Sequence, residues 1–454
     1  MIKNKYQTYK FGLITASAFV VANMIGTGVF TSLGFQLQST SNFVTILLIW
    51  LLGGIIALCG ALVYGELGAA MPRSGGEYHY LRVIYHPMLG FMAGWASLIV
   101  GFAAPVALAS MAFGTYLNGV FPDVNPVYAA LGILTFITLV HVSDLKLSGM
   151  VQSLFTFFKI AVILLFIIAG LFCPAARQDV PGLSAEFDIT ELFTGGFAVS
   201  LIWVYYAYSG WNASAYMAGE IRNPQRNIPR SLLASTVIVT ILYVLLNGVF
   251  MLTTPADVIN GQLEVGLIAS RYIFPGNIWK IMGLVIALLL VSSISSMAFL
   301  GPRVSQVMGE DTYILRFLSK RSSRGIPYVA VWVQFGISFL LIITDSFALI
   351  TKYAGVTLSF FALLTVTGLF VHRRRFPHAD RPYKTWGYPV VPCLFILLIS
   401  WSIVYLVYED YENTFINDTQ GFMWLTLMSG LTLLTGAGIY LLNRFISSYK
   451  LNRT

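Results

Sequence analysis

Long stretches without charged residues alternate with short polar stretches along almost the whole chain. The first such stretch, residues 11–65, is long enough for two membrane spans, because a helix needs about 20 apolar residues to cross the hydrocarbon. The apolar runs are continuous rather than alternating with period two, which excludes a transmembrane β-barrel. We expect twelve transmembrane helices, over residues 11–36, 43–70, 89–118, 125–142, 148–172, 193–218, 232–253, 277–305, 327–344, 348–371, 389–408 and 421–445.

Two of these segments contain glycine in a way that predicts a broken helix. Residues 25–29 of the first segment read Ile-Gly-Thr-Gly-Val, and residues 208–211 of the sixth read Tyr-Ser-Gly-Trp. A break frees backbone N–H and C=O groups that hydrocarbon cannot satisfy, so it persists only against protein or a watery cavity. Breaks at corresponding positions of two halves are typical of the binding site of a secondary transporter.

The two breaks also predict an internal repeat within a single membrane domain, residues 1–454. Five segments begin with each broken helix, over residues 11–172 and 193–371, and because five is odd the second set has inverted topology. The last two segments, residues 389–445, fall outside the repeat. Between the spans, residues 71–88 predict a short surface helix and residues 257–275 predict a lid-like element on the other side.

Composition excludes a soluble protein and favours a defined orientation. Only 10% of the residues are charged, whereas soluble domains have about 25%. Most of the 27 Lys and Arg residues fall in the loops on the side of the N-terminus, which predicts that both termini are cytoplasmic in the plasma (inner) membrane. The net charge of +8 then reflects this topology and attraction to anionic lipid, with no nucleic-acid role. No cleavable signal peptide is expected.

Cysteines and other metal-ligating groups do not form a site in the sequence. Cys59, Cys173 and Cys393 lie on different segments without the spacing of a disulfide or a metal centre. We expect them to be small buried hydrophobic residues. Neither a cofactor nor enzymatic chemistry is expected, because no His, Cys or carboxylate cluster lies within the apolar segments.

The first break offers backbone N–H groups. With Gly26 and Gly28 on either side of Thr27 and following Ile25, the half-helix that begins there presents its positive end, which suits a carboxylate. The alternative is that small residues only allow two helices to pack closely. The matched break in the sixth segment favours the binding site.

The second break offers carbonyl groups and aromatic side chains. The carbonyls of residues 207–210, Ala207, Tyr208, Ser209 and Gly210, could accept hydrogen bonds from a substrate ammonium. Tyrosines at positions 205, 206 and 208 could form an aromatic gate, or they could belong to an interfacial aromatic belt. Their depth in the segment favours the gate, and Tyr206 is the side chain that we select for it.

Two charged residues lie inside apolar segments. A lysine at the depth of Lys159 costs about 2.5–3.5 kcal/mol on insertion scales, and such residues usually serve a substrate or ion pathway rather than snorkelling to the surface. We expect Lys159 to bond carbonyls of the first segment and a hydroxyl of the eighth, where Ser293 is favoured over its neighbours at 292, 295 and 296. Serines that bond within their own helix are the alternative. Glu66 is either a gate partner or an interface residue.

Several motifs together resemble one family, the amino acid-polyamine-organocation superfamily, and within it the bacterial relatives of the L-type amino acid transporters. The resemblance spans the first to the eleventh segment. It rests on residues 26–30 (Gly-Thr-Gly-Val-Phe), 64–67 (Tyr-Gly-Glu-Leu), 72–78 (Pro-Arg-Ser-Gly-Gly-Glu-Tyr), 155–159 (ending in Lys159), 208–212 (Tyr-Ser-Gly-Trp-Asn), 220–224 (Glu-Ile-Arg-Asn-Pro) and 381–384 (Arg-Pro-Tyr-Lys).

The resemblance implies a LeuT-like fold and a sodium-independent carrier of L-amino acids. It places the substrate carboxylate on N–H groups of the first segment and the ammonium on carbonyls of the sixth, with Lys159 where related transporters hold a sodium ion. Two departures are Tyr206, where relatives often have Phe, and residues 308–312 (Met-Gly-Glu-Asp-Thr), which replace an Arg-Asp-Gly pattern. Residues 118–126 contain no cysteine, so the disulfide to a heavy-chain partner seen in animal relatives is not expected.

The sequence therefore predicts a secondary transporter of small neutral L-amino acids that works by exchange or proton symport through alternating access. A neutral substrate is favoured because the third segment contains no acidic residue between Arg82 and Asp123. The alternatives are a cationic amino acid or polyamine antiporter of the same fold, and a transport-inactive amino acid sensor.

Overall fold

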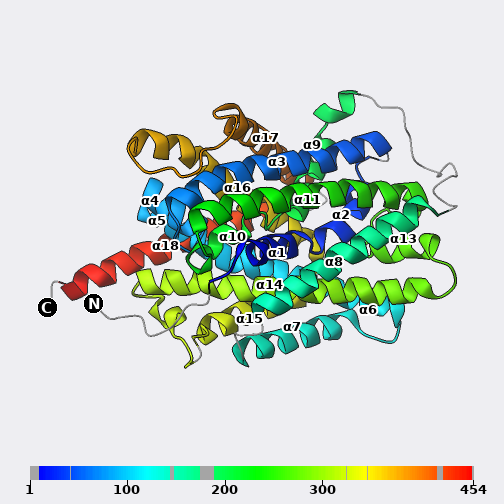
Figure 1. The fold of residues 1–454 in the computed structure, drawn as a ribbon, viewed down its shortest axis with the longest axis horizontal. Coiled ribbons are helices and arrows are strands. Elements are labelled where there is room, and N and C mark those ends of the chain that lie inside the picture. Colours follow the sequence, from blue (N-terminus) through cyan, green and yellow to red (C-terminus); the bar gives the residue numbers. More distant parts are fainter. Residues whose placement is uncertain are drawn as a thin grey trace.

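The computed structural model describes residues 10–40, 42–143, 148–173, 189–323, 325–344, 346–416 and 423–451. The ends of the chain, on which the expected cytoplasmic position of both termini depends, lie outside these residues. The described part is helical, and the long helices run roughly side by side along one axis of the molecule (Figure 1).

Ten helical stretches in the described part are long and apolar enough to cross a membrane. Two shorter apolar helices, α9 (Gly195–Ala207) and α15 (Tyr328–Ile343), occupy the sixth and ninth predicted segments. The ten are α1–α2 (Leu13–Met24 and Gly28–Gln36), α3 (Phe43–Ala70), α5–α6 (Pro87–Ala96 and Ala104–Val120, joined by a π-helical turn, Ser97–Ala103), α7 (Pro126–Ser143), α8 (Ser148–Leu171), α11 (Pro224–Thr253), α14 (Ile278–Asp311), α16 (Phe347–Arg375), α17 (Val390–Phe415) and α18 (Trp424–Leu451).

Several helices extend further into polar sequence than the charge pattern predicts, among them α11 and α14. We expect a helix from residue 232, but α11 begins at Pro224, because proline suits the first turn of a helix, where its missing N–H would have no partner. Similarly, α14 continues past the expected end at 305 to Asp311. Charged residues mark where a segment leaves the membrane, and they do not mark where its helix ends.

Short helices cover the two ends of the bundle. The surface helix expected within residues 71–88 is α4 (Glu77–Ile84). The expected lid-like stretch contains α12 (Ala256–Ile259) and α13 (Val265–Ile273), and α13 packs on α14 and α2. Figure 1 shows α4 and α13 at opposite ends of the long axis, and we call these the α4 end and the α13 end.

Both predicted breaks interrupt helices, and they face each other. Residues 25–27 separate α1 from α2, and α9 ends at Ala207, followed by a turn and by α10 (Ala213–Tyr216). A Cβ atom added to Gly28 would collide with the backbone of Ala207, and one added to Gly210 would lie 2.8 Å from the Cβ of Asn23. Glycine is therefore required for the two broken helices to approach each other.

The helices that carry the breaks lie in the interior of the bundle. Among the 18 most apolar consecutive residues of the α1–α2 stretch, 78% are buried, compared with 17% of the corresponding residues of α18. Large apolar side chains on α7, α17 and α18 are exposed, including Phe136, Leu397 and Leu434. An apolar exposed surface around a buried centre that contains glycine breaks is the arrangement expected of a membrane protein.

Candidate functional site

A small cavity lies between the two breaks, and we call it the central cavity. Its volume is about 10 Å³, which is about enough for one water molecule. Both breaks contribute to its wall, together with α6 and α14. It is lined by Asn23, Met24, Gly26, Thr27, Gly28, Pro105, Ala109, Tyr206, Ala207, Ser209, Ser293 and Met297.

The first break presents the beginning of a helix to this cavity. After α1, the N–H of Gly26 donates to the carbonyl of Met24 at 2.8 Å, and α2 starts at Gly28. The first N–H groups of a helix have no partner inside that helix, and they carry its partial positive charge. Gly26, Thr27 and Gly28 line the cavity at this positive end.

The second break presents the end of α9. Helix ends leave carbonyl groups without helical partners, but several here are already engaged. The Tyr206 carbonyl accepts from the N–H of Ser209 at 2.8 Å, and the Ala207 carbonyl accepts from the Tyr243 hydroxyl at 3.2 Å. Gly210 has a φ of +94°, a left-handed conformation that favours glycine. A carbonyl has two lone pairs, so the Ala207 carbonyl can still accept a second bond.

The three tyrosines of α9 and its end point to different places. Tyr206, the side chain selected as the gate, lines the central cavity. Tyr205 lines a neighbouring cavity toward the α4 end. The Tyr208 hydroxyl donates to the carbonyl of Trp50 on α3 at 3.0 Å, and Tyr208 does not line either cavity. Tyr208 is therefore packed against α3, and the three tyrosines do not line one cavity.

Lys159 reaches the first break from α8. It is fully buried, and its Nζ donates to the carbonyls of Ile25 at 2.7 Å and Ala22 at 3.3 Å and to Ser293 Oγ at 2.6 Å. Ser293 in turn donates to the Ile25 carbonyl at 2.9 Å. The three donors of the ammonium thus each have an acceptor, and Lys159 ties the broken end of α1 to α14. Ile25 takes part through its carbonyl and does not line the cavity.

The serines around Ser293 do not act as one group. Ser296 accepts from the Asn23 amide at 2.8 Å, and Ser295 bonds the ring of His141 at 3.0 Å. Ser292 is buried, without a hydrogen-bond partner in the described part of the chain. Successive residues of a helix face different directions, so only Ser293 is placed to meet Lys159.

Tyr243 on α11 is a site residue that the sequence reasoning missed. Its hydroxyl contacts the carbonyl of Met24 at the first break and that of Ala207 at the second. Its ring packs on Tyr208 with centroids 4.9 Å apart and on Trp50 at 5.5 Å. A single tyrosine in an apolar segment gives no sequence signal of this kind, because it is equally typical of a core or of a membrane interface.

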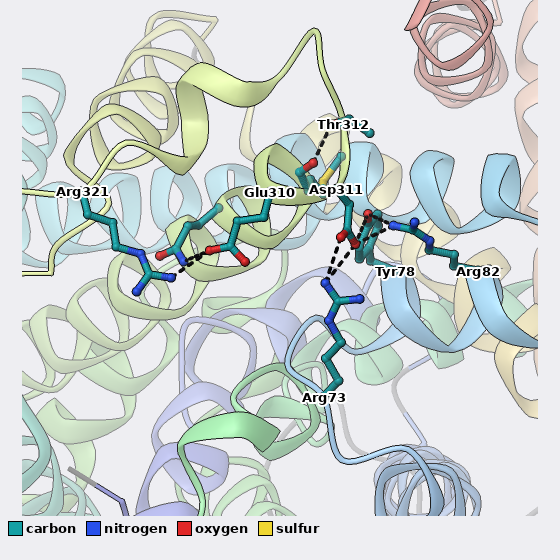
Figure 2. Close-up of polar contacts among 9 residues, drawn as sticks. Arg73, Tyr78, Arg82, Glu310, Asp311, Thr312 and Arg321 are labelled. Atoms are coloured by element: carbon teal, nitrogen blue, oxygen red, sulfur yellow. Dashed lines mark hydrogen bonds and ion pairs between the residues drawn. The ribbon is translucent and has the colours of Figure 1, made fainter. Parts of the chain in front are cut away.

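Glu66 forms an ion pair at the α4 end. Its carboxylate accepts from Arg373 at 2.6 and 2.9 Å and from the N–H of Thr385 at 2.7 Å. It therefore joins α3 to the end of α16 and the following loop. Residues 308–312 also act at this end, since Asp311 binds Arg73 and Arg82 of the 71–88 region (Figure 2).

Comparison with known proteins identifies the family. The sequence profile described as amino acid permease matches residues 11–434. The chain belongs to the amino acid permease family. It is 30% identical over 403 residues to b(0,+)-type amino acid transporter 1 of Homo sapiens, covering 87% of this chain and 82% of that protein.

Two further relatives support the assignment of this permease to the amino acid-polyamine-organocation superfamily. Serine/threonine exchanger SteT of Bacillus subtilis is 27% identical over 435 residues, which is 94% of each protein. Large neutral amino acids transporter small subunit 2 of Homo sapiens is 26% identical over 410 residues, 88% of this chain and 76% of that protein. The resemblance seen in the motifs is thus confirmed, and the family consists of membrane transporters rather than enzymes.

Proposed function

We propose that this permease is a sodium-independent secondary transporter of small neutral L-amino acids that works through alternating access. The observation that carries the proposal is the Lys159 ammonium, which binds the Ile25 and Ala22 carbonyls and Ser293 beside the first break. A fixed ammonium at this position supplies the positive charge that a bound sodium ion would otherwise supply. Exchange is the mode favoured by the name of the Bacillus subtilis relative, and proton symport is the alternative.

In the proposed complex, the substrate spans the two breaks. Its carboxylate binds the N–H groups of Thr27 and Gly28 at the positive end of α2, and that of Gly26 once its bond to the Met24 carbonyl is released. Its ammonium binds free lone pairs among the carbonyls of residues 207–210, and Tyr206 covers it. The central cavity has room for about one water molecule, so α1 or α9 must move to admit an amino acid.

A small neutral side chain fits the lining of the central cavity. Among the described residues, those that line it include no Asp, Glu, Lys or Arg. The nearest part of α6 contributes Pro105 and Ala109, which are apolar. A cationic side chain would require a carboxylate at this position, which is why the cationic amino acid or polyamine antiporter is the second choice.

We further propose the finer topology predicted from the sequence. It has twelve spans, formed by inverted repeats at residues 11–172 and 193–371 and by the two helices of 389–445, in the plasma membrane. The α4 end is cytoplasmic, supported by the arginines gathered there, Arg73, Arg82, Arg303, Arg373 and Arg381. The lipid bilayer is its environment, and no disulfide-linked heavy chain is required.

Counterflow in proteoliposomes tests the proposal. Liposomes loaded with single unlabelled amino acids are assayed for uptake of the same labelled amino acid, with and without sodium and with and without a pH gradient. We expect uptake with serine, threonine or alanine that is independent of sodium, with protein-free liposomes as the control. Uptake only with arginine or polyamines would support the antiporter, and binding without counterflow would support the sensor.

A further inference from the structure

Glu77, the first residue of α4, holds a buried carboxylate that is only half engaged. Its side chain lies at the α4 end, and the residue is 5% exposed. One oxygen, Oε1, accepts from the Tyr64 hydroxyl at 2.7 Å and from the Asn212 amide at 2.8 Å. The other oxygen, Oε2, is buried without a hydrogen-bond partner in the described part of the chain. The carboxylate is thus held in a fixed position with one acceptor free.

This carboxylate lines a second cavity, of about 50 Å³, which we call the transit cavity. The transit cavity adjoins the central cavity, because both are lined by Asn23, Pro105, Ser209 and Met297. Asn212 and Tyr216 lie with Glu77 on its polar wall, and its apolar wall is formed by Phe102, Leu300, Leu358 and Phe361. Its volume suffices for a few water-sized groups.

Neighbouring cations do not neutralise Glu77. Arg73 and Arg82 both bind Asp311, at 2.9 and 2.5 Å (Figure 2), and Arg303 binds Glu220 at 2.8 Å. No ion pair within 4.0 Å joins Glu77 to a Lys or Arg of the described residues. A buried carboxylate without a counter-charge is unfavourable, so the transit cavity is suited to a small cation that enters and leaves.

We propose that Glu77 forms a transit site for the α-ammonium group of the substrate, between the central cavity and the α4 end. The proposal rests on the proposed transport function and adds a second binding position to it. At the central cavity the ammonium meets only peptide dipoles, whereas in the transit cavity it meets a full negative charge. The apolar wall accommodates the side chain of the same amino acid. Release toward the α4 end then proceeds in two steps.

The test uses the full-length protein in proteoliposomes of uniform orientation, checked by protease access to an N-terminal tag. The apparent KM for serine is measured separately on each face by exchange, in the wild type and in Glu77→Gln. Gln keeps an oxygen for Tyr64 and Asn212 but removes the charge. We expect KM at the face of the α4 end to rise about tenfold or more, as for loss of a charged hydrogen bond, and KM at the opposite face to change less than about twofold.

Glu310→Gln is the matched control, because Glu310 is an exposed carboxylate of the same end that binds Arg321 at 2.8 Å. It should leave both KM values unchanged. An equal rise of KM on both faces in Glu77→Gln would overturn the transit site. An unchanged KM together with loss of the pH dependence of exchange would also overturn it, because Glu77 would then act as a proton acceptor. If Glu77→Gln does not fold, Glu77→Asp, which withdraws the charge by one methylene, must show the same one-sided rise. Absence of exchange in the wild type would instead refute the transport function.

Discussion

The two ends of the central cavity are closed by different kinds of contact. At the α4 end, charged side chains join the helices: Arg303 binds Glu220 at 2.8 Å, and Asp311 binds two arginines. At the α13 end the contacts that join α2 to α9 and to the start of α16 are aromatic. The ring of Phe35 stacks on Trp203, with centroids 4.5 Å apart and planes 7° apart, and it also stacks on Phe347.

Backbone contacts complete the closure of the α13 end. Tyr116 on α6 donates to the Phe30 carbonyl at 3.0 Å and accepts from the N–H of Gly266 at 3.1 Å. The N–H of Gly261 donates to the Gly34 carbonyl at 2.8 Å. Salt screens exposed charge pairs and leaves neutral packing almost untouched. Because the two closures depend on different interactions, we expect each end to loosen without the other, as the proposed alternating access requires.

The largest expected effect comes from removing Lys159, which joins the first break to α14. Lys159→Ala deletes the ammonium that joins the broken end of α1 to α14 and leaves the Ile25 carbonyl with Ser293 alone. We expect transport in the counterflow assay to be abolished or uncoupled from pH. Without this contact, the proposed alternation between the two ends would be lost.

Lys352→Ala is the control for Lys159→Ala. Lys352 lies at the beginning of α16 and binds Glu409 at 3.0 Å, partly exposed. A partly exposed ion pair contributes about 1 kcal/mol or less, so this variant should transport like the wild type. Unchanged uptake and pH dependence in Lys159→Ala would remove Lys159 from its assigned role.

A smaller effect is expected from the charged end alone. Asp311→Asn frees Arg73 and Arg82 from their shared partner (Figure 2). A cysteine placed at Ala109 in the central cavity, in a protein without its native cysteines, reports access of an impermeant thiol reagent. We expect its modification from the α4 end to speed up about five- to tenfold, the effect of about 1 kcal/mol, and modification from the α13 end to stay the same.

Salt provides an independent check on Asp311→Asn. In the otherwise unchanged reporter protein, raising the ionic strength from about 0.1 M to 1 M shortens the Debye length from about 10 to 3 Å. High salt should therefore speed up modification of the reporter cysteine from the α4 end, by less than Asp311→Asn does, and leave modification from the α13 end unchanged. Glu310→Gln, next in the chain and paired with Arg321 at the surface, should have no effect. Equal acceleration from both ends would show that the two closures are not independent.

The aromatic end should respond less strongly, and without salt dependence. Trp203→Ala removes the stack with Phe35, and such pairs contribute about 0.5–1.5 kcal/mol beyond their buried area. Because Phe35 keeps its stack on Phe347, we expect the lower part of this range, about 0.5–1 kcal/mol, so that modification of the same reporter from the α13 end rises about two- to fivefold. Phe193→Ala, which truncates a ring that is 74% exposed near the start of α9, is the control and should change nothing. A salt-dependent rate in Trp203→Ala would contradict the assignment of this end as neutral.

Ten of the predicted spans coincide with helices long and apolar enough to cross a membrane, and the helices α1 and α9 end at the predicted glycine motifs, because both features depend on local rules. A long run of residues without charge predicts a span, and glycine within such a run predicts a break. The helices α1 and α2 separate at residues 25–27, inside the predicted motif. The partners of Lys159 could also be anticipated, because a buried ammonium must find carbonyl or hydroxyl acceptors and few exist among apolar helices.

What the sequence could not give is the direction of each side chain beyond a break. Helical periodicity fails where the helix stops, so Tyr208 could not be separated from Tyr206, although it turns to Trp50 on α3. Tyr243 and Asp311 act through partners far away in the chain, Met24 and Arg73. Such pairings depend on how the helices pack, which one sequence does not specify.

The smallest expected effect is a pH dependence confined to the α4 end. Burial, with the nearby positive charge of Arg73, lowers the pKa of His79 on α4 from 6.5 to about 4. Between these values the unfolded chain binds a proton that the folded protein does not, so stability is complete above pH 6.5 and falls as the pH drops toward 4. His79→Gln should reduce the fall in Tm between pH 7 and pH 5 by on the order of 1 °C. His378→Gln, at an exposed site in the loop after α16, should leave the fall in Tm unchanged. An equal reduction in both variants would mean that burial of His79 has no part in the acid sensitivity of this end.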